Sequence, residues 1–203
     1  MLTSIFALHR VGIKEDRKFE IEDDIKLTLA VLESDIQRYF KSVEPIVSKN
    51  QWKYNKQLCG AIQEYVEAVS FKHYLSNETV ITLDEIQQTI PNIIITHADY
   101  LLGIMDLTGE LMRYAISNLA DTTRSESKAP DTPYAITPRR LSHISQTISV
   151  TLRDLNTELT LLDINRIASI RGYQELNKKI EVFRSSLAKL EYAQYSLLVR
   201  MGT

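Results

Sequence analysis

Hydrophobic residues recur at intervals of three and four along most of the chain, which is the spacing of one face of an α-helix. The pattern predicts long helices over roughly residues 21–47, 52–75 and 97–117, followed by two more after residue 137. No alternation with a period of two is present, so the sequence predicts an all-α protein with one domain over residues 1–203. The predicted core positions are Ile25, Leu29, Leu32, Ile36, Phe40 and Val43; Leu58, Ile62, Tyr65 and Val69; Leu141, Ile144, Ile148, Leu152, Leu155, Leu159 and Leu162; and Leu176, Ile180, Phe183, Leu187, Leu190 and Leu197. The last two stripes are close to heptads, which favours antiparallel packing of these two helices or packing along partner helices.

Shorter signals mark the ends of several helices. Thr82 followed three residues later by Glu85 is the pattern of a capping box, which predicts a short helix ending before residue 91. Residues 121–133 are polar and contain proline, so they predict a loop. Thr137 and Pro138 are suited to the N-cap and the first position of the helix that follows.

The predicted helix over His97–Ser117 has an unusual distribution of charge. On a helical wheel all of its charged residues fall within a strip about 60° wide, and the rest of its circumference is mainly apolar. These charged residues are Asp99, Asp106, Glu110 and Arg113. A helix of this kind is expected to be buried on most sides, with a narrow acidic strip.

Gly103 and Gly109 flank this acidic strip. Glycine inside a helix costs about 1 kcal/mol relative to alanine, so both positions call for a reason. We expect another backbone or a ligand to approach closely at each of them.

A second pair of acidic residues, Glu64 and Glu67, lies on the helix predicted over residues 52–75. Three residues apart, they are neighbours on the helix surface and lie away from its main apolar stripe. Periodicity alone predicts that they are exposed to solvent. Gly60, Ala68 and Phe71 share their side, however, which indicates a second packed surface.

If these two helices pack together, four carboxylates converge: Glu64, Glu67, Asp106 and Glu110. Carboxylates at close quarters repel one another unless they are protonated or share a cation. Ligands that are all oxygen favour Mg²⁺ or Mn²⁺, which can activate water and neutralise charge on a phosphodiester. The alternative is that the glutamates lie on a solvated face and that Glu110 pairs with Arg113.

Composition limits the classes of function. The net charge of −2 gives no overall basic field that would attract nucleic acid. Cys59 is the sole cysteine, so an intrachain disulfide is impossible and a reducing compartment is expected. No stretch is long and apolar enough for a membrane span, and the N-terminus does not resemble a signal peptide. Lys178, Lys179 and Arg184 are typical of a solvated helix face.

Two motifs resemble the Trax branch of the translin family: GAIQEYVEAVSFKHYL at residues 60–75 and ADYLLGIMDLTGELMR at residues 98–113. The segments SIFALHRV, ITLDEI, DTPY and SSLAKLEYAQYSLLVRMG fit the same pattern in the same order, so the resemblance covers nearly the whole chain. It implies a translin-like antiparallel bundle of about six to seven helices by the family pattern.

The resemblance also implies a function. Trax-like chains combine with translin in barrel-like hetero-oligomers that act as Mg²⁺-dependent endoribonucleases, cleaving passenger-strand fragments of small RNAs or tRNA precursors in the cytoplasm and nucleus. The catalytic, metal-binding carboxylates of the family map onto Glu64 and Glu67 of EYVE and onto Asp106 and Glu110 of DLTGE. Arg113 is a candidate for contacting the scissile phosphate.

The chain departs from the family pattern in two places. Met1 falls inside the expected first helix, whose apolar segment here is Leu2–Val11, so the usual longer N-terminal segment is not seen. Residues 159–171 are longer and more apolar than the expected linker. Two other functions stay open: a non-catalytic translin partner that stabilises an oligomer binding single-stranded RNA or DNA, and a helical adaptor without a nucleic-acid role.

Overall fold

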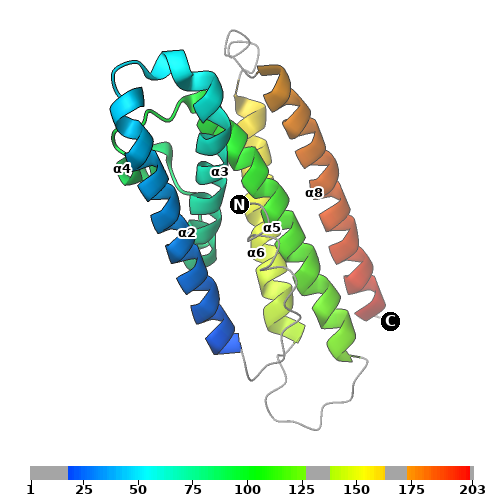
Figure 1. The fold of residues 1–203 in the computed structure, drawn as a ribbon. Coiled ribbons are helices and arrows are strands. Elements are labelled where there is room, and N and C mark those ends of the chain that lie inside the picture. Colours follow the sequence, from blue (N-terminus) through cyan, green and yellow to red (C-terminus); the bar gives the residue numbers. More distant parts are fainter. Residues whose placement is uncertain (1–17, 127–137, 163–172, 202–203) are drawn as a thin grey trace.

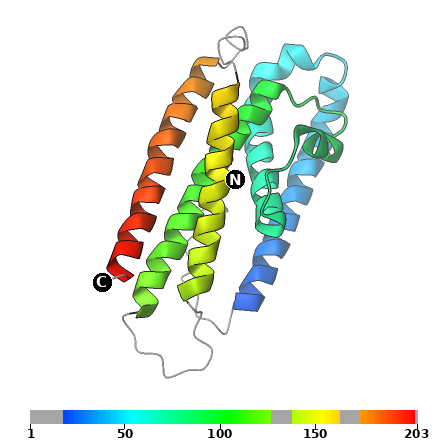
Figure 2. The ribbon, with the colours of Figure 1, turned by 180° about the vertical axis from the view of Figure 1, so that it is seen from behind.

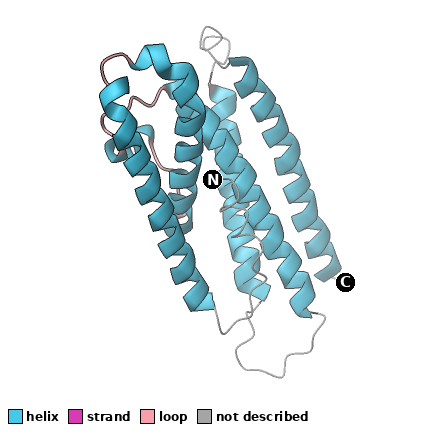
Figure 3. Ribbon diagram, in the orientation of Figure 1, coloured by secondary structure: helices cyan, strands magenta, loops and turns pink. Residues whose placement is uncertain are grey.

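The computed structural model describes residues 18–126, 138–162 and 173–201, and within these ranges it contains six α-helices and no strand (Figures 1 and 3). The prediction of an all-α fold is confirmed. The helices are α2 (Lys18–Val47), α3 (Gln51–Asn77), α4 (Leu83–Thr89), α5 (His97–Glu126), α6 (Pro138–Leu161) and α8 (Tyr173–Met201). In the part of the chain that is described, no helix combines the length and apolar character needed to cross a membrane.

Helix α5 is the central element of the bundle. It packs against α3, α6 and α8, while α2 packs against α3, so that α2 and α8 lie at opposite edges (Figure 1). Gln63 of α3 bonds Asp99 near the beginning of α5, and Phe71, later in α3, makes an edge-on ring contact with Tyr114, later in α5. These two helices therefore run in parallel.

Helices α6 and α8 run in opposite directions, as their heptad-like stripes indicate, and Figure 2 shows them side by side from the back of the bundle. Ser149 near the middle of α6 bonds Gln194 late in α8, whereas Asn156 later in α6 bonds Arg184 earlier in α8. The antiparallel prediction is confirmed for this pair.

Most predicted core positions are buried where the structure describes their side chains. Buried members of the predicted stripes are Phe40, Leu58, Ile62, Tyr65, Val69, Ile148, Leu152, Leu159, Leu176, Ile180, Phe183, Leu187 and Leu190, and partly buried ones are Ile36, Val43, Ile144, Leu155 and Leu197. The prediction was wrong for Leu162, which is 41% exposed because it follows the last residue of α6. The side chains of Ile25, Leu29, Leu32 and Leu141 lie outside the described ones.

The predicted loop over residues 121–133 was wrong at its beginning. Helix α5 continues to Glu126, since no proline or glycine interrupts the chain there and polar residues are compatible with a helix end. The other residues of that loop, the apolar segment Leu2–Val11, Thr137 and residues 163–171 of the long linker lie outside the described residues.

The capping box of α4 is confirmed. The Thr82 hydroxyl oxygen accepts a hydrogen bond from the Glu85 backbone N–H at 3.3 Å, and the Glu85 carboxylate accepts one from the Thr82 backbone N–H at 2.8 Å. This reciprocal pair fixes the beginning of the short helix. The Thr82 hydroxyl also donates to the Glu85 carboxylate at 2.7 Å, and this bond, followed by the one from the Thr82 backbone, lowers the pKa of Glu85.

Two glutamine side chains hold the segment that leads into α5. The amide of Gln51 donates to the Ile94 carbonyl at 2.6 Å and accepts from the Ile94 N–H at 2.8 Å. The amide of Gln87 bonds the backbone of Ile90, Ile93 and Ile95 in the same way. Because this segment has no secondary structure of its own, these bonds satisfy its backbone and fix where α5 begins.

Gly103 lies at the closest approach of α3 and α5. A Cβ atom at this position would be 2.7 Å from Cβ of Val66 and 2.9 Å from the carbonyl oxygen of Gln63. The expected close approach is therefore confirmed at Gly103. At Gly109 no other helix of the described chain comes within 4 Å of an added Cβ, so the close approach of a backbone was wrong there and that of a ligand stays a prediction.

These two glycines give a matched test of the packing. We expect Gly103→Ala to lower the free energy of unfolding by about 1–3 kcal/mol, because α3 and α5 must separate to admit the methyl group. Gly109→Ala should be neutral or stabilising by up to about 1 kcal/mol, because alanine favours the helix and meets nothing. Urea denaturation measures both, and equal losses at the two positions would contradict the packing described here.

Candidate carboxylate site

The contact between α3 and α5 brings the two predicted carboxylate pairs together. Glu67 and Glu110 are buried, at 6% and 4% exposed, whereas the Asp106 side chain is 36% exposed and Glu64 is intermediate. The solvated-face alternative is therefore wrong for Glu67. It failed because α3 is packed on two sides, and its periodicity marks only one of them.

The second packed surface of α3 agrees partly with the sequence. Phe71 is buried and its ring meets that of Tyr114 edge-on, with 6.3 Å between the centroids. Val66, next to Glu67, is the residue that packs on Gly103. Gly60 is exposed, and a Cβ atom added there would meet no other part of the described chain within 4 Å. Gly60 therefore takes no part in this surface.

The electrostatics of Glu67 show that the carboxylates are close enough to interact. The pKa of Glu67 is raised from 4.5 to about 7, first by burial and then by the charges of Asp106 and Glu110. Glu64 adds a smaller increase, which the positive charge of Lys179 partly opposes. Glu67 thus lies within electrostatic range of Asp106, Glu110 and Glu64, and the assignment of the four carboxylates to one metal site stays a prediction.

Lys179 is a member of the site that sequence reasoning missed. Its ammonium group donates to both carboxylate oxygens of Asp106 at 2.7 Å, across the contact between α5 and α8. The prediction of a solvated face was wrong for this lysine. Its position directly before Ile180, at the border of the apolar stripe of α8, was the available signal, but the stripe does not reveal which helix lies opposite.

Arg113 forms an ion pair with Glu110 one turn earlier on α5, as the alternative interpretation of the sequence proposed. The Arg113 side chain is 52% exposed, whereas that of Glu110 is 5% exposed. The guanidinium thus lies at the surface end of the acidic strip. Its predicted contact with a phosphate stays a prediction.

The chemistry of the donor set fits a hard divalent cation, because it consists of carboxylate oxygens that repel one another. Within the described residues, no group of three or more His, Cys, Asp or Glu side chains is gathered closely enough to hold a metal ion. The positive charge at Asp106 comes from the Lys179 ammonium instead. The carboxylates would have to turn toward one another, and Lys179 away from Asp106, for an ion to be held.

Comparison with known proteins decides the family. The family model described as the Translin family matches residues 3–201. The chain belongs to the translin family. Among the relatives of this translin-family chain is Translin-associated protein X of Pongo abelii, which is 28% identical over 97% of this chain and 67% of its own length. The protein of that name from Mus musculus is 26% identical over the same shares, and the homolog from Schizosaccharomyces pombe is 26% identical over 97% of this chain and 74% of its own length.

The raised pKa of Glu67 predicts a pH dependence of stability without divalent ions. Folding raises this pKa from 4.5 to about 7, so the folded chain binds the proton more tightly than the unfolded chain. Glu67 therefore does not lower the free energy of unfolding below pH 4.5, where it is protonated in both states. As the pH rises it lowers the free energy of unfolding progressively, and the loss is complete above about pH 7. We expect Glu67→Gln to raise the melting temperature at pH 8 and to lose this advantage by pH 4.5, in buffers containing EDTA.

Glu85→Gln is the matched control, because the capping hydrogen bonds lower the pKa of Glu85. Its ionised form stabilises the fold above its unfolded pKa, and this contribution is lost as the pH falls through the folded pKa. The Glu85→Gln variant should therefore be less stable than wild type at neutral pH and equal to it in acid. An advantage of Glu67→Gln that is the same at every pH would contradict the burial and charge repulsion described for Glu67.

Proposed function

We propose that this chain is the catalytic, Trax-like subunit of a translin-containing, Mg²⁺-dependent endoribonuclease. The observation that carries the proposal is the approach of Glu67 to Asp106 and Glu110: burial, together with the charges of these two residues, raises the pKa of Glu67 to about 7. Strongly shifted carboxylates at such a contact are typical of functional sites. The relatives named Translin-associated protein X support the assignment to this branch.

In this proposal Glu64, Glu67, Asp106 and Glu110 hold Mg²⁺ or Mn²⁺. Held there, such an ion would supply a lowered pKa of water and neutralisation of charge on the phosphodiester. Because the pKa of Glu67 is about 7 without an ion, binding of the ion near neutral pH would release a proton from Glu67.

In this proposal two cations beside the carboxylates would contact the phosphate backbone. Lys179 bonds Asp106, and a divalent ion held by Asp106 would release the Lys179 ammonium to the edge of the site. Arg113 pairs with Glu110 but keeps an exposed guanidinium. Both cations would offset the repulsion between the acidic surface and an anionic substrate.

The proposed partner is translin, which is part of the name of the relatives, Translin-associated protein X. An apolar surface on the outer side of α8 supports a partner, since large exposed apolar residues in one region mark interaction sites. It comprises Tyr192, Tyr195, Leu198 and Val199. The proposed substrates are passenger-strand fragments of small RNAs or tRNA precursors, and basic residues of the partner would supply most of the phosphate binding.

The second candidate is a non-catalytic subunit that stabilises a translin oligomer binding single-stranded RNA or DNA. One observation favours it: Asp106 and Glu110 each have a cationic partner, and no metal-holding group is gathered within the described residues. The variants below separate the two functions.

We expect the chain without translin to self-associate and to bind RNA weakly, because its net charge is −2 and α8 exposes apolar residues. Co-expression with translin should give a soluble assembly of defined mass that binds single-stranded RNA. Size-exclusion chromatography with light scattering, followed by RNA titration at two salt concentrations, measures this. A stable monomer with tight, salt-sensitive RNA binding would contradict the expectation.

Asp106→Asn and Glu67→Gln should each slow RNA cleavage by at least about a hundredfold, the scale seen when one electrostatic catalytic group is removed. Assembly with translin should persist, since removing one charge relieves repulsion in the metal-free state. The measurement is single-turnover cleavage over a Mg²⁺ titration, with EDTA as the zero point. Asp154→Asn, at an exposed position on α6, is the matched control and should cleave like wild type.

Arg113→Ala distinguishes the two roles of that side chain. If Arg113 serves only as the partner of Glu110, the variant loses stability and keeps its cleavage rate. If it contacts the scissile phosphate, the rate falls while the melting temperature is unchanged. Wild-type rates in both carboxylate variants would remove the carboxylate cluster from the mechanism and leave the non-catalytic subunit as the better description.

A further inference from the structure

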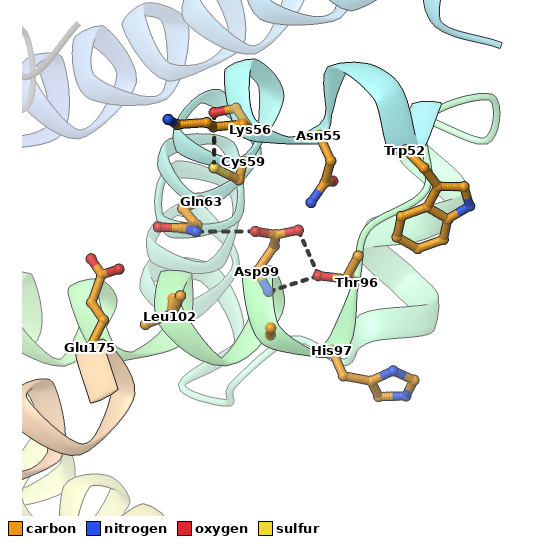
Figure 4. Close-up of a pocket in the computed structure, with 11 residues that line it drawn as sticks. Trp52, Asn55, Lys56, Cys59, Gln63, Thr96, His97, Asp99, Leu102 and Glu175 are labelled. Atoms are coloured by element: carbon orange, nitrogen blue, oxygen red, sulfur yellow. Dashed lines mark hydrogen bonds between the residues drawn. The ribbon is translucent and has the colours of Figure 1, made fainter. Parts of the chain in front are cut away.

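A cavity of about 560 Å³ lies between the first turns of α3 and the beginning of α5, with Glu175 of α8 at its side (Figure 4). Its volume is in the range of small-molecule and cofactor pockets, about 300–1,000 Å³. Trp52, Asn55 and Lys56 line it from α3, and Asp99 lines it from α5. None of these residues belongs to the carboxylate cluster described above.

The walls of this cavity are held in place by hydrogen bonds within the protein. Asp99 is 4% exposed, and its carboxylate accepts from the Gln63 amide at 3.1 Å and from the Thr96 hydroxyl at 2.6 Å (Figure 4). The two bonds between Gln51 and Ile94 tie the first turn of α3 to the segment before α5. The cavity is therefore preformed, and the oxygens of Asp99 are already occupied.

One polar group in the wall has no partner. The side-chain oxygen of Asn55 is buried and accepts no hydrogen bond from any described residue. In Figure 4 the Asn55 side chain points from α3 toward Thr96 and Asp99, with its amide nitrogen leading. A buried acceptor left without a donor costs about 1–3 kcal/mol, so a rotation of this amide that brings its oxygen to an N–H or O–H group of a ligand in the cavity is favoured.

The rim of the cavity combines an aromatic face with a positive charge. Trp52 is the only tryptophan in the sequence and is 67% exposed, which is unusual for the largest apolar side chain. Lys56, one turn further along α3, is also exposed. Figure 4 shows the two side chains on opposite sides of the cavity. An exposed aromatic ring and a lysine at one groove are the combination with which proteins stack the bases and neutralise the phosphates of single strands.

The cavity also lies next to the carboxylate cluster along all three helices. Its lining residues Gln63, Leu102 and Glu175 precede Glu67, Asp106 and Lys179, respectively, by four residues each. Because α3 and α5 run in parallel and Lys179 of α8 bonds Asp106, the near end of the cavity is displaced from the cluster by about one helical turn, roughly 5.4 Å. Trp52, at the far end, precedes Glu67 by fifteen residues on α3, roughly 22 Å along the helix axis. A single strand several nucleotides long can therefore reach from one place to the other.

We propose that this cavity is a binding site for one nucleotide of single-stranded RNA, several nucleotides along the strand from the phosphate that lies at the carboxylate cluster. The base stacks on Trp52, the Asn55 side-chain amide hydrogen-bonds the base edge, and Lys56 contacts a phosphate. The proposal rests on the proposed function for its substrate, but binding at the cavity can be measured without cleavage.

The binding test uses the unique tryptophan as a reporter. The chain is produced with 5-fluorotryptophan and assembled with unlabelled translin, so that Trp52 gives the single fluorine resonance. A 2′-O-methyl single-stranded oligonucleotide is added in EDTA, which permits binding and prevents cleavage. We expect the resonance to shift on titration, and the RNA to protect Cys59, the sole cysteine and a residue of the cavity wall, from alkylation. The same readouts apply to the chain without translin.

Variants test the individual contacts. Trp52→Ala should raise KM for RNA cleavage by about 5- to 100-fold, the loss expected for one stacked base, with a smaller change in kcat, and Trp52→Phe should restore most of the affinity. Lys56→Ala should weaken binding and reduce the slope of log affinity against log salt by about 0.7. Lys53→Ala is the matched control, because Lys53 is exposed on the same helix, does not line the cavity and lies 5.5 Å from the Tyr54 ring centre.

The outcomes separate this site from the proposed nuclease activity. A shifted Trp52 resonance in an assembly that cleaves no RNA supports the cavity and removes the nuclease function. RNA cleavage with an unshifted resonance, an unprotected Cys59 and wild-type KM in Trp52→Ala overturns the cavity and leaves the function standing. Equal effects of Lys53→Ala and Lys56→Ala would also overturn it, since they would indicate only general attraction to positive charge.

Discussion

The close contact between α3 and α5 at Gly103 is the constraint on which the other features depend. A side chain at this position would meet Val66 and the Gln63 backbone, so the two helices are closer here than a larger residue permits. Glu67 follows Val66 directly, and its burial results from this approach. The same contact places Gln63 on Asp99 and thereby forms one wall of the cavity between the helices. The glycine at position 103 thus permits the helix contact on which the positions of both candidate sites depend.

This arrangement opposes the stability of the isolated fold. Burial and three neighbouring carboxylates raise the pKa of Glu67 to about 7, which means that its ionised form is disfavoured in the folded chain. The positive charge of Lys179 on α8 partly opposes this repulsion at Glu67, and Arg113 pairs with Glu110 on α5. Apolar residues of similar volume would pack such a contact without this cost. A cluster of this kind is therefore better explained by a function than by folding.

The periodicity of the sequence predicted the elements well, because each long helix buries one face that repeats along it. It also predicted the acidic strip of α5, since all of its charges lie on one helix. It could not predict Lys179, because the pattern of α8 does not reveal that α5 lies opposite. For a related reason it could not predict that another helix approaches Gly103 and not Gly109, because a glycine at a tight contact and one at an open surface look identical in sequence. The loop predicted from residue 121 failed because polar composition resembles both a loop and a helix end.

Asp99 and Asp106 lie on the same strip of α5, yet their surroundings differ in kind. The carboxylate of Asp99 accepts hydrogen bonds from Gln63 and Thr96, which are part of the cavity wall. These bonds cannot be exchanged for other partners without disrupting that wall. The charge of Asp106 is taken up by the ammonium of Lys179, at the end of a flexible side chain that is 25% exposed. A lysine of this kind can withdraw into solvent when a stronger cation arrives. Of the two aspartates, Asp106 is thus the one able to exchange its partner, and we expect a divalent ion to enter the site there.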